Sequence, residues 1–358
     1  MNILISGVGG PTPKNIARSI KISRYAHEAK LFGTELNPLK YGLYEKDLYE
    51  KTAITPHASK ACYWESIEGF INQNDITCAI VQPEQEVLAW AKHKREGGSW
   101  PCKALIPDYD VVKVLVNKGR MTEMLKDSGF VPKSLIFSPK ELHIEELEAK
   151  FDYPFWVRST CGSSGLASLK VTSRESLETW LNLNGAIDEF IASTYLPGRN
   201  LACKLLFHRG ELLRAACGER VNYIMANTAP SKITGNTAYG RLLNEPKVVA
   251  FAAEVLELVF QKTGAEKHGF FTVDIKEDEY GKPFITEINV RMVAFNLSFA
   301  QGGANFSEDI LQLLQDEEGF DRSFKIYEFK PGTIFLRDVD SEPILMNESQ
   351  IKSPFIDV

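Results

Sequence analysis

The sequence lacks the features that mark several common classes of protein. Its six cysteines form no CxxC pair and its six histidines form no HExxH motif, so the spacing indicates neither a common zinc site nor a disulfide framework. Lysine and arginine form no run typical of a nucleic-acid interface. No apolar run approaches the ~18 residues of a membrane span, and the first residues, MNILISGVGG, lack the basic start of a secretory leader. We therefore expect a cytoplasmic protein with reduced thiols that binds neither nucleic acid nor a membrane.

The composition is that of an ordinary globular chain. It has 358 residues, of which 44% are hydrophobic and 25% charged, and its formal net charge is −6. This length allows two or three domains with a sizeable core. An acidic chain can still bind phosphate where a few basic residues converge.

Two kinds of α/β pattern follow one another along the chain. Up to about residue 107, predicted strands at MNILISGVGG, AKLFGTEL, TCAIVQPE and KALIP alternate with predicted helices at residues 14–29, WESIEGFINQN and EVLAWAKHKREGG. Such a βαβαβ pattern is typical of a parallel sheet with helices on its faces. The rest mixes strands with helices, including a helix that Gly129 ends, a helix over 246–263, a hairpin in GFFTVDIKEDEYGKPFITEINVRM and a strand pair in KIYEFKPGTIFLRDV. The predicted fold class is therefore α/β followed by α+β.

Polar residues alternate with apolar ones along GKPFITEINVRM, residues 281–292. Glu287, Asn289 and Arg291 occupy every second position, so they share one face of a strand. We expect the hairpin register to place Asp274 beside Glu287. Two carboxylates and an amide oxygen suit Mg²⁺, with substrate phosphates and water as further ligands, and Arg291 would then hold a transferring phosphoryl group. A half-exposed strand with a salt bridge shows the same alternation, so this pattern alone leaves both interpretations open.

Three further segments contain candidate ligands for a nucleotide. Arg158 ends a strand in PFWVRS, and the loop after it could turn its N–H groups toward phosphate oxygens through Gly162, Ser163, Ser164 and Gly165. Lys118 opens a helix in VLVNKGRM, and FIASTYLPGRN could form a hinge whose backbone binds a flat ring. Each segment also has an ordinary interpretation: a plain turn with an exposed arginine, a solvated lysine, and a strand with a turn.

The order of these segments resembles the ATP-grasp superfamily. A lysine opens VNKGRMTEMLKDSGFVPKS, a basic strand end precedes the glycine loop in PFWVRSTCGSSGLASLKV, a hinge ends in YLPGRN, and the hairpin ends in E-x-N-x-R. GTELNPLKYGLY is similar to the GxDxxPxAxGLY pattern of the domain that precedes the ATP-grasp fold. The resemblance covers roughly residues 1–320 and is nearest to the carbamoyl-phosphate-synthase-like branch.

This resemblance implies a division of the chain and a set of ligand-binding residues. The implied parts are a pre-ATP-grasp domain (1–107), a small subdomain with the phosphate loop (108–195), a C-terminal subdomain with the metal site (196–325) and a strand extension (326–358). ATP and Mg²⁺, or Mn²⁺, are the implied cofactors. Phosphates would contact Lys118, Arg158 and the loop; the hinge would hold adenine and ribose through Ser193, Thr194, Tyr195, Leu196 and Asn200. Asp274, Glu287 and Asn289 would bind two metal ions, and Arg291 and Arg158 would be catalytic.

The resemblance implies an ATP-dependent ligase. It would convert a small carboxylate into an acyl phosphate and join it to an amine, and a homodimer is consistent with the family. Two positions depart from the family, since Thr194 and Asn200 stand where acids are usual. These departures put adenine and ribose recognition in question and keep two alternatives open: a non-catalytic MgATP-binding module and an ATP-grasp kinase.

Two other features have competing interpretations. Gly7, Gly9 and Gly10 match a dinucleotide fingerprint only in part, although Glu35 stands where a ribose-binding acid would. A tight turn in the first domain explains the same residues. Arg220, in CGERVNY, is a candidate second contact to phosphate or to an acidic substrate, or else a surface charge.

Overall fold

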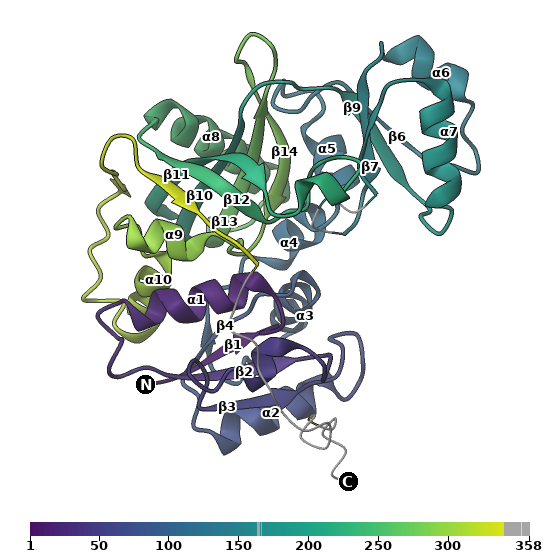
Figure 1. Cartoon of the computed structure of the whole chain (residues 1–358). Helices are drawn as coiled ribbons and strands as arrows, with labels where there is room; N and C mark the ends of the chain where they lie inside the picture. The colour runs from purple at the N-terminus through teal and green to yellow at the C-terminus, as the bar shows by residue number, and fades with distance from the viewer. Residues whose placement is uncertain (163–164, 166, 340–351, 353–358) are drawn as a thin grey trace.

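The structure is a computed structural model, and it describes residues 1–162, 165, 167–339 and 352. Three sheets organise the chain (Figure 1). Within the described residues, no helix has both the length and the apolar composition needed to cross a bilayer.

The N-terminal part is a five-stranded parallel sheet in the order β3-β2-β1-β4-β5. Its strands are β1 (Asn2–Ser6), β2 (Lys30–Glu35), β3 (Lys51–Ile54), β4 (Cys78–Ile80) and β5 (Lys103–Ala104). Its helices are α1 (Pro11–Lys21), α2 (Tyr63–Gln73) and α3 (Glu84–Arg95), and a short 3-10 turn, η1 (Tyr41–Tyr44), follows β2. The predicted parallel α/β domain is confirmed, although β3 was missed.

The predicted helix over 14–29 was wrong in both bounds. Helix α1 begins at Pro11, because proline has the φ of a first helical turn and needs no N–H partner there. It ends at Lys21, where the N–H and hydroxyl of Ser23 both donate to the carbonyl of Ile20 and close the last turn.

The largest sheet follows the order β14-β13-β10-β11-β12-β16, with β15 beside β11. Its strands are β10 (Asn200–His208), β11 (Glu211–Tyr223), β12 (Thr237–Leu243), β13 (Gly269–Glu277), β14 (Pro283–Asn289), β15 (Lys325–Ile326) and β16 (Ile334–Leu336). The predicted strand pair near the C-terminus was wrong, because β15 pairs with β11 and β16 with β12 rather than with each other. Strands β11 and β12 each have residues free to pair, so β15 adds to β11 and β16 adds to β12.

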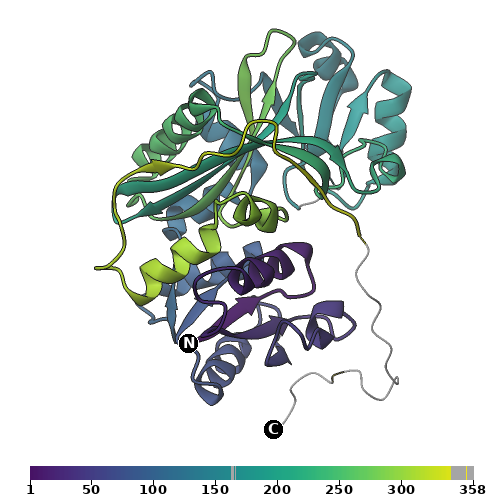
Figure 2. The same cartoon turned by 60° about the vertical axis from the view of Figure 1, so that its left-hand side comes forward.

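Alternate residues of β10 enter two different cores. Leu201, Cys203 and Leu205 pack toward α8 (Pro246–Thr263), whereas Ala202 and Leu206 pack on the opposite face of the sheet. That opposite face is covered by α9 (Asn296–Gln301) and α10 (Phe306–Gln315), which lie between the sheet and α1 of the first domain (Figures 1 and 2).

The smallest sheet has the order β6-β9-β7-β8 and a core of its own. Its strands are β6 (Ser134–Phe137), β7 (Phe155–Ser159), β8 (Leu169–Val171) and β9 (Phe190–Thr194), and its helices are α6 (Ile144–Lys150) and α7 (Arg174–Leu183). Two helices precede it, α4 (Tyr109–Leu115) and α5 (Lys118–Leu125). Sequence reasoning found only the second of the two. The helical conformation is interrupted between them because Asn117 adopts an extended conformation and caps α5.

Candidate active site

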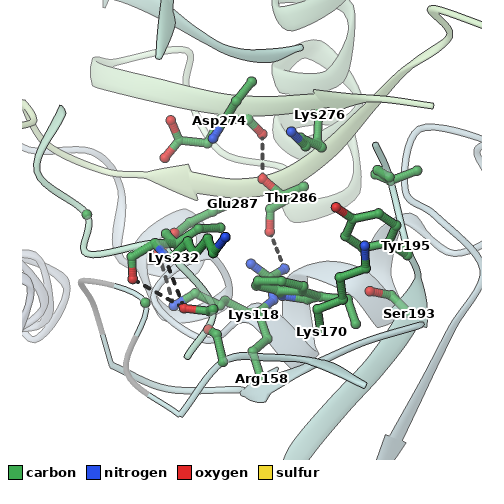
Figure 3. A pocket seen from close by; sticks show the side chains of 18 of the residues that line it. Lys118, Arg158, Lys170, Ser193, Tyr195, Lys232, Asp274, Lys276, Thr286 and Glu287 are labelled. Atoms are coloured by element: carbon green, nitrogen blue, oxygen red, sulfur yellow. Dashed lines mark hydrogen bonds and ion pairs between the residues drawn. The ribbon is translucent and has the colours of Figure 1, made fainter. Parts of the chain in front are cut away.

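A cavity of about 640 Å³ lies between the small sheet and the large sheet. Strands β7, β8 and β9 and the N-terminus of α5 form one wall, and β10, β11 and the β13–β14 hairpin form the other. Figure 3 shows Lys118 and Glu287 toward one end of this cavity, with Tyr195 and Ser193 toward the other.

The β13–β14 hairpin has the predicted register. Asp274 pairs directly with Glu287, and a bulge then shifts the pairing so that Ile275 faces Ile285. One carboxylate oxygen of Asp274 accepts from Arg220 at 2.6 Å, and the other accepts from the amide of Asn289 at 3.1 Å. The structure thus brings the three predicted oxygen donors together.

The Glu287 carboxylate pairs with one cation and lies near two more. The ammonium of Lys118 lies 3.0 Å from Glu287 and also donates to the carbonyl of Gly162 at 2.6 Å. Burial alone would raise the pKa of Glu287, but the charges of Lys118, Arg158 and Arg291 lower it below its usual value. Glu287 is therefore an anion at neutral pH. Lys118 reaches it because the Asn117 side chain accepts from the N–H of Arg120 and fixes the start of α5.

Arg158 points from the end of β7 across the cavity and donates to the carbonyl of Thr286 (Figure 3). Burial lowers its pKa. Its Nε atom, like those of Arg220 and Arg291, is buried with no hydrogen-bond partner among the described residues. Buried guanidinium N–H groups without partners are costly, so these donors are suited to an anionic ligand.

The glycine loop contacts the lysine that opens α5. The carbonyl of Gly162 accepts from the ammonium of Lys118 at 2.6 Å. Gly165 has a positive φ of 69°, and an added Cβ would lie 2.3 Å from the carbonyl oxygen of Ile233, so glycine is required there. The predicted contacts Ser163 and Ser164 lie outside the described residues.

The hinge residues line the other end of the cavity. Ser193 and Thr194 end β9, and Tyr195 and Leu196 follow it against the cavity. The amide of Asn200 donates to the Tyr223 hydroxyl.

Arg291 lies two residues beyond the end of β14. Strand β14 ends at Asn289, so the alternation stops before Arg291. The Arg291 guanidinium donates to Glu84 at 2.9 Å, at the start of α3 in the first domain. It therefore bridges the first domain and the β13–β14 hairpin, close enough to Glu287 to lower its pKa.

The cavity residues that sequence reasoning missed include Trp156, Lys170, Tyr223 and Lys276. Lys276 follows Asp274 by two positions on β13, and Trp156 precedes Arg158 by two on β7, so strand alternation could have found both. Lys170 lies with its ammonium 4.1 Å from the centre of the Tyr195 ring. No local signal indicated this contact, because Lys170 lies on β8 and Tyr195 directly follows β9.

The donor set at the hairpin fits Mg²⁺. Asp274, Glu287 and Asn289 offer two carboxylates and one amide, which is the share that proteins usually give this ion when phosphate and water complete the shell. Among the described residues there is no cluster of three His, Cys, Asp or Glu side chains that would form an all-protein metal cage.

The glycine turn after β1 does not favour the dinucleotide interpretation. One carboxylate oxygen of Glu35 accepts from the N–H of Gly9 at 2.7 Å, and the other accepts from Leu36 and Asn37. The acid that would contact a ribose thus stabilises its own loop.

Comparisons with known proteins agree with this architecture. No family model matches the sequence, and no curated protein matches it significantly. The solved structure of an L-amino acid ligase from Bacillus licheniformis is similar with a TM-score of 0.63 at 16% identity, covering 90% of this chain and 77% of that one. An N5-carboxyaminoimidazole synthetase from Staphylococcus aureus, complexed with ADP, has a TM-score of 0.66 at 16% identity and covers 92% and 79%. A D-alanine–D-alanine ligase from Bacillus anthracis has a TM-score of 0.58 at 13% identity and covers 88% and 96%.

Proposed function

The chain has the fold of the ATP-grasp ligases, and from this premise we propose that it is an ATP-dependent carboxylate–amine ligase. ATP would phosphorylate a small carboxylate, and an amine would displace phosphate from the acyl phosphate to form an amide. ADP and phosphate are the other products. Two of the similar structures are named as an L-amino acid ligase and a D-alanine–D-alanine ligase. The structure of the N5-carboxyaminoimidazole synthetase holds ADP.

The observation that carries the proposal is the meeting of Lys118, Arg158, Asp274 and Glu287 in one cavity. Phosphoryl transfer needs positioning and charge neutralisation more than a protein nucleophile. The cavity offers both. Lys118 and Arg158 approach from the wall of the small sheet, and Asp274 and Glu287 approach from the large sheet (Figure 3).

The predicted site residues have proposed roles. Lys118 and Arg158 bind the ATP phosphates, and their N–H groups neutralise charge as the phosphoryl group moves. Asp274, Glu287 and Asn289 hold Mg²⁺, which when bound offsets the charge of the phosphate oxygens. Arg291, placed by Glu84 at the boundary with the first domain, orients the phosphorylated carboxylate.

The hinge binds the base and the sugar without the usual acids. The backbone from Ser193 to Leu196 holds adenine, with Tyr195 under the ammonium of Lys170. Asn200, already bonded to the Tyr223 hydroxyl, takes the place of a ribose-binding carboxylate. A neutral amide makes a weaker hydrogen bond than a carboxylate, so we expect less contribution from ribose.

The test is ADP release from MgATP with pools of amino acids and small carboxylic acids. Hydroxylamine in a parallel reaction would trap an acyl phosphate as a hydroxamate. We expect ADP and hydroxamate with one pool, and ADP, free phosphate and an amide when an amine is added. ADP with a stable phosphorylated product would indicate a kinase, and MgATP binding without ADP from any pool would indicate a binding module; either result would overturn the ligase proposal.

A further inference from the structure

A second cavity, of about 800 Å³, lies on the other side of the β11–β12 turn from the first. Ile224 and Asn236 of this turn face the second cavity, while their neighbours Tyr223 and Gly235 face the first. Helix α1 of the first domain, α9 and the end of β16 enclose it. The second cavity thus lies where the first domain meets the large sheet.

The basic groups that line this second cavity differ in whether a carboxylate of the described residues pairs with them. Lys14 and Arg18 of α1 approach Glu45 at 3.1 and 3.6 Å. Arg337, just after β16, donates to the carbonyl of Thr237 at 3.0 Å but has no carboxylate within ion-pair distance among the described residues. The nearby Asp338 accepts instead from the N–H of Val339. Arg337 therefore offers to the cavity a half-buried guanidinium that no carboxylate of the described residues neutralises.

The sheet places Arg337 on the same face as the candidate active site. Arg220 on β11 pairs with Gly240 on β12, and Gly240 pairs with Phe335 on β16. Arg337 follows Phe335 by two positions and so continues on that face. The Phe335 ring stacks on Phe295 at 5.7 Å, and the Arg220 guanidinium lies 4.7 Å from the centre of Phe295.

A third basic side chain, that of Lys204, lies on the same face. Lys204 on β10 is fully buried, with its ammonium 4.4 Å from the Phe299 ring and bonded to Asn296. Burial, together with Arg220 and Arg337, lowers its pKa well below the usual value, and burial with Arg220 lowers the pKa of Arg337 to about 10. Asp274 pairs with Arg220 at 2.6 Å, and among the described residues no carboxylate lies within ion-pair distance of Lys204 or Arg337. Clustered cations repel one another, so this arrangement is stabilised by an added anion.

We propose that the second cavity binds the acid substrate of the ligation, and that this substrate is a small dicarboxylic acid. One carboxylate binds Arg337, and the other extends past Phe335 toward Arg220 and Asp274, where ATP would activate it. One free guanidinium matches one carboxylate in charge and in its paired N–H geometry. This substrate class rests on the proposed ligase function, whereas the binding of a dianion to Arg337 does not.

The test measures binding by calorimetry, with no turnover. Succinate and glutarate are compared with butyrate, and 3-phosphonopropanoate serves as the phosphate-bearing alternative. We expect succinate or glutarate to bind more tightly than butyrate, and Arg337→Ala to weaken that binding roughly 10–100-fold, the size of a charge-assisted contact. Arg337→Lys should recover only part of it, because it keeps the charge but loses the planar fork.

Arg241→Ala is the matched control. Arg241 is the next residue after Gly240, faces the other side of the sheet and pairs with Glu219 at 2.7 Å, so its loss should leave dicarboxylate binding unchanged. ADP binding, which uses the first cavity, reports that each variant is folded. The proposal is overturned if butyrate binds as tightly as both dicarboxylates, if 3-phosphonopropanoate binds best, or if Arg337→Ala binds like the unmutated protein. ADP release in the pool experiment tests the ligase function separately.

Discussion

The β13–β14 hairpin and the hinge between β9 and β10 border the same cavity, yet they present opposite chemistry to it. The hairpin presents carboxylates, each held by a cation: Glu287 by Lys118 at 3.0 Å and Asp274 by Arg220 at 2.6 Å. The hinge presents main chain, the Tyr195 ring and the neutral amide of Asn200. The hairpin end of the cavity therefore selects charge, where a single substitution has a large effect, and the hinge end selects shape, where many small contacts share the energy.

The largest effect should come from the hairpin. Glu287→Ala removes a proposed metal ligand and leaves Lys118 and Arg158 without their carboxylate. Even outer partners of a metal site cost about 10–100-fold in activity, so we expect ADP release to fall by more than roughly 10²-fold. The measurement is ADP release at saturating MgATP with the active substrate pool.

Glu279→Ala is the control for this change, because Glu279 lies exposed in the turn of the same hairpin. It should keep full activity. Undiminished ADP release by Glu287→Ala would remove the metal assignment and with it the contrast between the hairpin end and the hinge end of the cavity.

The same contrast explains what could be predicted from the sequence. Asp274, Glu287 and Asn289 are close in the chain and follow strand alternation, so their meeting could be predicted from local pattern and register. Lys170 on β8 reaches Tyr195 because β7 lies between β8 and β9 in the small sheet, an order that no local pattern specifies, and Tyr223 meets Asn200 across 23 residues of chain.

Helix and strand errors have the same origin. The break between α4 and α5 depends on Asn117, whose capping bond is local but whose extended conformation is supported by a bond from Lys118 N–H to the distant Thr160 carbonyl. Strand β16 exists because β12 leaves an edge to pair with, so its partner could not be deduced from its own three residues.

A smaller effect should come from the glycine where hinge and hairpin touch. An added Cβ on Gly198 would lie 2.6 Å from the carbonyl oxygen of Asp278 and 2.7 Å from the Cβ of Glu277. Gly198→Ala should therefore lower the free energy of unfolding by about 1–3 kcal/mol, the usual cost of overpacking, as measured by urea denaturation. Gly185→Ala, whose added Cβ would meet only a carbonyl oxygen at 3.5 Å, should change it by no more than about 0.5 kcal/mol. Equal stability of the two variants would mean that the hinge moves away from the hairpin at little cost.

The smallest effect should come from the hinge itself. Tyr195→Ala removes an aromatic ring that lies under Lys170 and lines the proposed adenine end of the cavity. An aromatic contact contributes about 0.5–1.5 kcal/mol beyond its buried area, so we expect the Kd for MgADP to rise roughly 2–10-fold while the rate at saturating MgATP is kept. Tyr280→Ala is the control, because Tyr280 is 87% exposed on the hairpin turn and touches no part of the cavity. If Tyr195→Ala instead reduced the saturated rate as strongly as Glu287→Ala, the hinge would have to position the phosphates as well as the base. The hairpin end and the hinge end would then act as one unit, and the division between charge and shape would not describe this site.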